Sequence, residues 1–188
     1  MRLLLVSLLF PFFCSAQQDT LLEYTRLEKI LLAPGNLSKT TVEPVGQLRN
    51  IEITGIIVEE LNSGKIQQGL LFREVSLAPL STNFSGGLIV DLEEVAKLAD
   101  ALTKIKNEIK ANKEPSLKTY QFVSEGLVTF TIESRKVNPD KCSLDICRRY
   151  KFSHNSVYGP CIMKNSFGAD DIEQLIVILK VYMAPWSK

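Results

Sequence analysis

The stretch GGLIVDLEEVAKLADALTKIK, Gly86 to Lys106, passes from a short apolar run through an acidic cluster into a helical pattern. Its apolar residues recur at helical spacing, and its acidic residues stand where the helix would begin. A second stretch, CIMKNSFGADDIEQLIVILK, Cys161 to Lys180, makes the same transition near the end of the chain. One chain of 188 residues therefore changes from strand to helix twice, which suggests a repeated architecture.

The two predicted helices align at an offset of 77 residues. Their acidic starts coincide, and the apolar positions Val95, Leu98 and Leu102 fall on Ile172, Leu175 and Leu179. The strands that open the two halves, at Lys39 and Lys118, are offset by 79 residues. Similar offsets at both ends predict a duplicated unit of four strands and a helix. Chance alignment is the alternative, because acidic residues are common at helix N-termini.

Apolar alternation and turn residues predict four strands before each helix. The first set covers 39–45, 48–61, 66–75 and 87–90 before a helix over 92–111, and the second covers 118–124, 127–137, 143–152 and 157–163 before a helix over 169–183. We therefore expect an α+β fold of two tandem antiparallel ββββα units that share one core. A short helix over 20–32, stopped by Pro34-Gly35, precedes them.

The stretch MRLLLVSLLFPFFCSA, residues 1–16, has the features of a secretory signal peptide: a basic start, an apolar run and small residues before the cut. Its apolar run of about 11 residues is short of the ~20 that a transmembrane helix needs. A membrane anchor and a lipid-bearing Cys14 are the alternatives. We predict an exported protein, periplasmic or secreted, with no transmembrane segment in the mature chain.

These boundaries divide the chain into four parts. Residues 1–16 are the signal peptide, 17–37 the N-terminal helix and linker, 38–112 the first ββββα unit and 113–188 the second. Removing the signal peptide leaves 21 basic and 21 acidic side chains. Such a neutral balance disfavours nucleic acid as the partner, because binding to it rests largely on neutralising phosphates.

Three cysteines, Cys142, Cys147 and Cys161, follow the predicted signal peptide, and export would place them where disulfides persist. A three-residue turn over 153–155 would pair residues whose numbers sum to 308, and Cys147 and Cys161 meet that condition. We predict a Cys147–Cys161 disulfide across this hairpin. A Cys142–Cys147 bond that closes a bulged loop is the alternative.

The sequence predicts no catalytic residues, no cofactor and no metal site. Asp91, Glu93 and Glu94 offer carboxylates to a cation, but the chain has no DxDxDG loop, and the dipole of the helix that they begin explains them. The lone histidine, His154, falls at a predicted hairpin tip, where an imidazole is hard to shield from water.

The densest basic run is Arg148, Arg149, Tyr150 and Lys151, which we take as the candidate binding surface. Basic and aromatic side chains on a sheet bind single strands by charge and stacking. In a strand, however, alternate residues point to opposite faces, so the charge is divided. A solvated hairpin edge that resists aggregation is the alternative.

The element order over about residues 39–183 resembles the two-fold strand-strand-strand-strand-helix plan of Whirly and PUR-repeat proteins, which implies single-stranded nucleic acid as a ligand. A second, local resemblance rests on Phe72-Arg73-Glu74-Val75 and Asp91-Leu92-Glu93-Glu94. These segments look like the FEV-like strand and DxDE-like helix start of small uncharacterised bacterial exported proteins. That resemblance implies kinship of fold.

The sequence therefore favours an exported non-catalytic module that binds a protein or a small ligand through a sheet face or a groove between the halves. The first alternative is a hydrolase that uses scattered carboxylates such as Glu59, Asp91 and Glu125. The second is a Whirly- or PUR-like binder of single-stranded nucleic acid or another anionic polymer.

Overall fold

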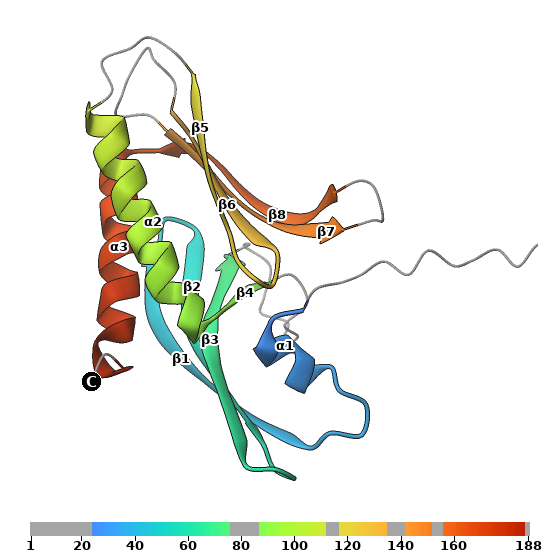
Figure 1. Cartoon of the computed structure of the whole chain (residues 1–188). Helices are drawn as coiled ribbons and strands as arrows, with labels where there is room; N and C mark the ends of the chain where they lie inside the picture. Colours follow the sequence, from blue (N-terminus) through green and yellow to red (C-terminus); the bar gives the residue numbers. More distant parts are fainter. Residues whose placement is uncertain (1–23, 76–86, 112–116, 135–141, 152–155, 187–188) are drawn as a thin grey trace, which may run out of the picture.

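The computed structural model describes residues 24–75, 87–111, 117–134, 142–151 and 156–186, and the side chains of 149–151, 156–167 and 186 are not described. The described part is α+β, with two antiparallel sheets and three α-helices (Figure 1). In chain order its elements are α1 (Arg26–Leu31), β1 (Ser38–Leu48), β2 (Ile51–Glu60), β3 (Lys65–Glu74), β4 (Leu88–Asp91), α2 (Leu92–Ala111), β5 (Lys118–Val123), β6 (Val128–Ser134), β7 (Cys142–Lys151), β8 (Ser156–Phe167), α3 (Ala169–Met183) and the 3-10 turn η1 (Ala184–Trp186).

Each sheet is a meander in which neighbours in sequence are neighbours in space, in the orders β1-β2-β3-β4 and β5-β6-β7-β8. The strand expected over 48–61 is wrong at its start, because β1 continues to Leu48 and a tight turn at Arg49 leads into β2. Arg49 has a φ of 54°, in the left-handed region that suits such a turn. Pro44 lies at a register shift in β1, an edge strand, where a missing backbone donor is tolerated.

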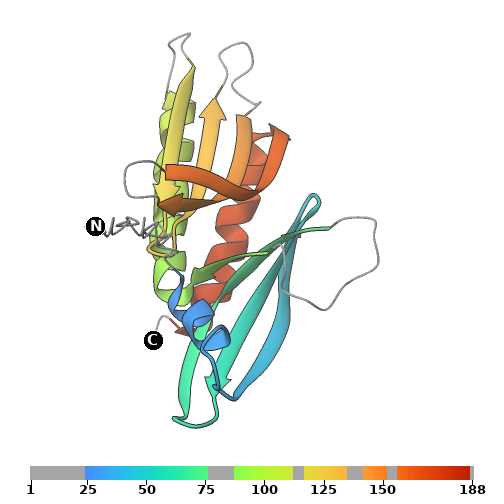
Figure 2. The same cartoon turned by 90° about the vertical axis from the view of Figure 1, so that its right-hand side faces the viewer.

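Both helices that follow the sheets lie side by side and pack along one side of the two sheets (Figures 1 and 2). The bounds expected for α2 and α3 are confirmed. The apolar stripe predicted on α2 is buried throughout, at Val95, Leu98, Leu102, Ile105 and Ile109.

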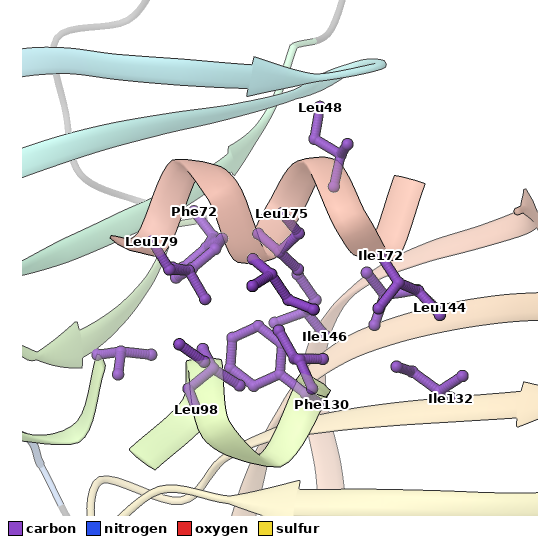
Figure 3. Packing of buried hydrophobic residues seen from close by; sticks show 14 of the residues in the cluster. Leu48, Phe72, Leu98, Phe130, Ile132, Leu144, Ile146, Ile172, Leu175 and Leu179 are labelled. Atoms are coloured by element: carbon purple, nitrogen blue, oxygen red, sulfur yellow. The ribbon is translucent and has the colours of Figure 1, made fainter. Parts of the chain in front are cut away.

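One hydrophobic core draws on both sheets and both helices (Figure 3). Phe72 on β3 meets Phe130 on β6 edge to face, with ring centroids 5.3 Å apart. Around this pair pack Leu98 of α2 and Leu175 and Leu179 of α3. The side chains of the two sheets therefore share a single interior, and neither sheet completes its core alone.

The helix that follows the second sheet also covers the first. Tyr182 of α3 donates a hydrogen bond of 3.0 Å to the carbonyl of Gly69, and its ring lies over Gly55. A Cβ atom at Gly55 would stand 2.9 Å from that ring, so glycine is what lets α3 approach. At the other end of α3, Arg49 binds Asp171 with a nitrogen–oxygen distance of 2.7 Å.

The opposite face of the first sheet carries a second, smaller core under α1. Because side chains alternate along a strand, Leu70 and Phe72 face α2 and α3 whereas Leu71 faces α1. Leu27 and Ile30 of α1 close this core with Ile56, Val58, Leu71 and Ile89. The helix expected over 20–32 begins only at Arg26, after the N-cap Thr25, and residues 20–23 lie outside the described part. No helix in the described ranges is both long and apolar enough to span a bilayer.

Replacing Phe130 with alanine should lower the free energy of unfolding by about 3–5 kcal/mol, because a fully buried ring leaves a cavity between the sheets. The matched control is Val123→Ala at the half-exposed end of β5, which should change it by less than about 0.5 kcal/mol. Urea unfolding measures both. Equal losses in the two variants would contradict a core shared through Phe130.

Candidate functional site

Charged side chains, most of them buried, gather where α1, the start of α2, the β5–β6 turn and β7 meet. We call this set the carboxylate junction and define it as Glu28, Asp91, Glu94, Glu125 and Arg148. Three of its acids, Glu28, Asp91 and Glu94, are almost fully buried. Buried acids with displaced pKa values are common in functional sites, so the contacts of each one decide what it does.

Asp91 holds α1 in place. One carboxylate oxygen accepts the backbone N–H of Arg26 at 2.7 Å, and the other accepts that of Leu27 at 3.2 Å. These are among the N–H groups that a helix start leaves without internal partners. Burial raises the pKa of Asp91, and the two N–H donors oppose that rise. The sequence suggested that Asp91 serves its own helix, but its carboxylate caps a helix 64 and 65 residues away.

Glu94 attaches the start of the second sheet to α2. Its Oε1 atom accepts the backbone N–H of Glu125, in the β5–β6 turn, at 2.6 Å. Its Oε2 atom is buried and has no hydrogen-bond partner among the described residues. Burial raises the pKa of Glu94, the N–H of Glu125 lowers it, and the nearby charges of Glu125 and Asp91 raise it further.

Glu28 and Arg148 join α1 to β7. Glu28 forms a capping box with Thr25: its carboxylate accepts the N–H of Thr25 at 3.0 Å, and its own N–H donates to the Thr25 hydroxyl at 3.1 Å. Arg148 pairs with the same carboxylate, and its guanidinium lies 6.0 Å from the centre of the Tyr24 ring. Only 13% of the Arg148 side chain and 10% of the Glu28 side chain are exposed, so the pair is shielded from water.

The rim of the junction is weaker. Arg26 reaches Glu93 at 3.2 Å and Glu125 at 3.8 Å, and Lys97 reaches Glu125 at 3.6 Å. All four side chains are more than half exposed, where ion pairs contribute little. The strength of the junction therefore comes from its buried members.

The residues named for a hydrolase are only partly brought together. Glu125 lies at the junction beside Glu94, but Glu59 lies elsewhere in the first sheet. Glu59 pairs with Ile66 of β3, whereas Asp91 pairs with Gly69 of the same strand, three residues away. The Cα atoms of Glu59 and Asp91 are therefore on the order of 14 Å apart. Both oxygens of Asp91 are already bound to backbone N–H groups.

Arg148 is the one member of the basic run whose side chain lies in the described part. Arg148 turns inward to Glu28, so it contributes little to an open basic surface. The backbone of Arg149, Tyr150 and Lys151 continues β7, but their side chains lie outside the described part. His154 also lies outside it. Within the ranges described, no three His, Cys, Asp or Glu residues are arranged to hold a metal ion.

The register of the last hairpin sets Cys147 of β7 opposite Cys161 of β8. Cys142 lies five residues from Cys147 on the same continuous strand, a separation of about 16 Å. Disulfides need Cα atoms within about 7 Å. The geometry of β7 therefore favours the Cys147–Cys161 pairing over the Cys142–Cys147 alternative.

Sequence reasoning missed the Glu28–Arg148 pair, whose members are 120 residues apart. One local signal was present: Thr25-Arg26-Leu27-Glu28 has the spacing of a capping box, which places the helix start at Thr25. Nothing in that spacing points to Arg148, because the pairing depends on how α1 lies across the two sheets.

Acidification should stabilise the wild-type protein relative to Asp91→Asn. A carboxyl whose pKa is raised in the folded state gives stability that is full below its ordinary pKa of 3.8 and is lost as pH rises through the raised value. The difference in unfolding free energy, wild type minus variant, should therefore fall as pH rises from about 4 toward neutrality. Denaturant titrations across that range test this, and a difference that stays constant with pH would contradict it.

Arg148→Met should destabilise the protein by about 3 kcal/mol, because it leaves the Glu28 carboxylate buried without its charged partner. Arg26→Met is the matched control: its ion pairs are 54% exposed on the arginine side, so we expect a loss below about 1 kcal/mol. Hydrogen exchange of the α1 amides should accelerate in Arg148→Met. Unchanged exchange there would contradict the anchoring of α1 by Arg148.

Compared with known proteins, the chain matches no family model, no curated protein and no solved structure.

Proposed function

We propose that this protein is an exported, non-catalytic module that binds a partner protein through the projecting end of its first sheet. The far ends of β1, β2 and β3 extend past the C-terminal end of α3 (Figures 1 and 2). Three large apolar side chains, Leu37, Leu61 and Ile66, are exposed there. We call them the distal patch, and its exposure is the observation that carries the proposal.

The register of the sheet puts the distal patch on one face. Glu59 pairs with both Lys39 and Ile66, so these three side chains share one face of the sheet. Leu37 is two residues before Lys39 and Leu61 is two residues after Glu59, which puts both on that same face. Gly55, which lies under Tyr182, is four residues from Glu59 on β2 and so shares the same face. The patch is thus the uncovered continuation of the face that α3 covers. Contiguous exposed apolar groups with polar neighbours are typical of protein-binding surfaces.

The contacts of the carboxylate junction support an architectural role for its acids. Asp91 accepts the backbone N–H groups of both Arg26 and Leu27, Glu94 accepts that of Glu125, and Glu28 accepts that of Thr25. Together with the Glu28–Arg148 pair, these contacts tie α1 and both sheets to one another. We therefore do not assign hydrolysis to them. Arg148 likewise serves Glu28, which leaves the basic run less suited to an anionic polymer.

Export and duplication complete the proposal. The segment 1–16 supports secretion to the periplasm or the outside of the cell, with a partner protein or small ligand met there. The repeated order of four strands and a helix, together with offsets of 77 and 79 residues, supports descent of the two units from one duplicated ancestor.

A photo-crosslinking residue at Ile66, in cells that export the protein, should capture one predominant partner. The same residue at Lys104, exposed on α2, is the control and should not capture it. With the purified partner, Leu61→Asp should raise the dissociation constant at least about ten-fold, as expected when a charge replaces an apolar contact. Equal capture at the two positions would contradict the distal patch as the binding surface.

The oxidised protein should contain a Cys147–Cys161 bond, with Cys142 remaining reduced. Non-reducing proteolysis and mass spectrometry should yield one linked peptide pair that carries Cys147 and Cys161, because the register sets these residues opposite each other. Alkylation before reduction should label the peptide with Cys142. Three alkylated cysteines in protein kept under oxidising conditions would overturn the pairing.

A further inference from the structure

The outer edge of β1 is a row of backbone hydrogen-bonding groups that pairs with no other described strand. β1 is the first strand of its sheet and pairs only with β2 in the part of the chain that is described. Its residues from Thr41 to Pro44 are all exposed, including 52% of the apolar Val42. A long exposed edge of this kind is a template for another strand.

The edge is self-complementary in charge. Its sequence Lys39-Thr40-Thr41-Val42-Glu43 can meet a second copy antiparallel about a two-fold axis at Thr41. Lys39 of each copy then stands opposite Glu43 of the other, and Thr40 stands opposite Val42. Opposite charges and β-branched pairs across antiparallel strands stabilise the contact. We propose that two copies of this chain join through Ser38–Pro44 of β1 and so continue the first sheet into its symmetry mate.

The neighbouring helix supports the same contact. Gln174 of α3 donates a hydrogen bond of 3.2 Å to the carbonyl of Gln47 in β1, which places this side of α3 beside the edge. Val177 and Val181 follow at three and seven residues, on the same side of the helix. They are 50% and 64% exposed. Joining two β1 edges brings these apolar side chains toward the second copy.

The edge also limits the assembly. Pro44 lacks a backbone donor, and the register shifts between Pro44 and Gly46, so the regular ladder ends there. Seven residues centred on Thr41 remain for pairing. A two-fold contact uses the same edge of both copies and is then closed, so the product is a dimer rather than a fibre. The two distal patches lie on the same face of the joined sheet.

Sedimentation velocity of the purified chain over a concentration series tests the dimer. Glu43→Lys puts lysine opposite lysine at both ends of the pairing and should raise the dimer dissociation constant at least about ten-fold. Lys39→Glu combined with Glu43→Lys restores opposite charges and should recover dimerisation. Glu108→Lys, at an exposed position of α2, is the control for net charge. Glu43 is exposed and faces Gly55 within its own sheet, so thermal unfolding should show that Glu43→Lys stays folded.

Crosslinking tests the register independently of charge. Thr41→Cys should form a covalent dimer under mild oxidation, because position 41 meets itself at the axis. Lys39→Cys should not, because its two copies would stand four residues apart, on the order of 13 Å. A chain that stays monomeric at every concentration up to about 200 μM, well above the μM dissociation constants of weak dimers, would overturn the proposal. So would a dimer that is indifferent to Glu43→Lys, or equal crosslinking at the two positions.

Discussion

The interior of this protein depends on two sheets that bury their apolar faces against the same pair of helices. A four-stranded meander has one face to hide, and a single helix covers only part of it. Here Phe72 and Phe130 meet edge to face between the sheets, and α2 and α3 surround them. Each half therefore needs the other to complete its core, and the rest of the structure depends on how the two halves are held against each other.

The relative position of the two halves is fixed at the edge of the core by polar contacts between segments far apart in sequence. Asp91 binds the start of α1, Glu94 binds the turn before β6, and Arg148 binds Glu28. Each contact places a carboxylate against a backbone N–H group or a guanidinium, so the acids have polar partners despite their burial. The raised pKa values of Asp91 and Glu94 reflect the burial that this architecture requires.

Sequence periodicity was sufficient to predict the bounds of the two long helices. Their apolar residues, from Val95 to Ile109 and from Ile172 to Leu179, recur at helical spacing over the whole of each pattern. It was insufficient at the turn between β1 and β2, because Leu48 and Ile51 are both apolar and only the backbone of Arg49 separates their strands. The contact between Asp91 and Arg26 could not be predicted, since no local sequence pattern specifies a contact across 65 residues.

Counting residues back from an assumed turn predicted the correct partner for Cys147, although the hairpin contains a register shift that the count did not include. Counting from a three-residue turn gave pairs that sum to 308, and Cys147 does stand opposite Cys161. Nearer the tip, however, Lys151 stands opposite Ser156, one residue out of that series. A register shift between Cys147 and Arg149 restores the count. Such a bulge cannot be predicted from the sequence alone, because its position depends on how the paired strands twist.

The position of α3 on the first sheet has a consequence for the order of synthesis. Arg49 leaves the ribosome early, but its partner Asp171 follows 122 residues later, and Tyr182, which covers Gly55, comes later still. One apolar face of the first sheet therefore stays only partly covered, by α2, until nearly the whole chain has been made. Contacts of such long range form slowly. Until α3 has been synthesised, the apolar side chains that Leu175 and Leu179 pack against lack that cover, so a chain cut short before Ala169 would expose apolar surface that the complete chain buries.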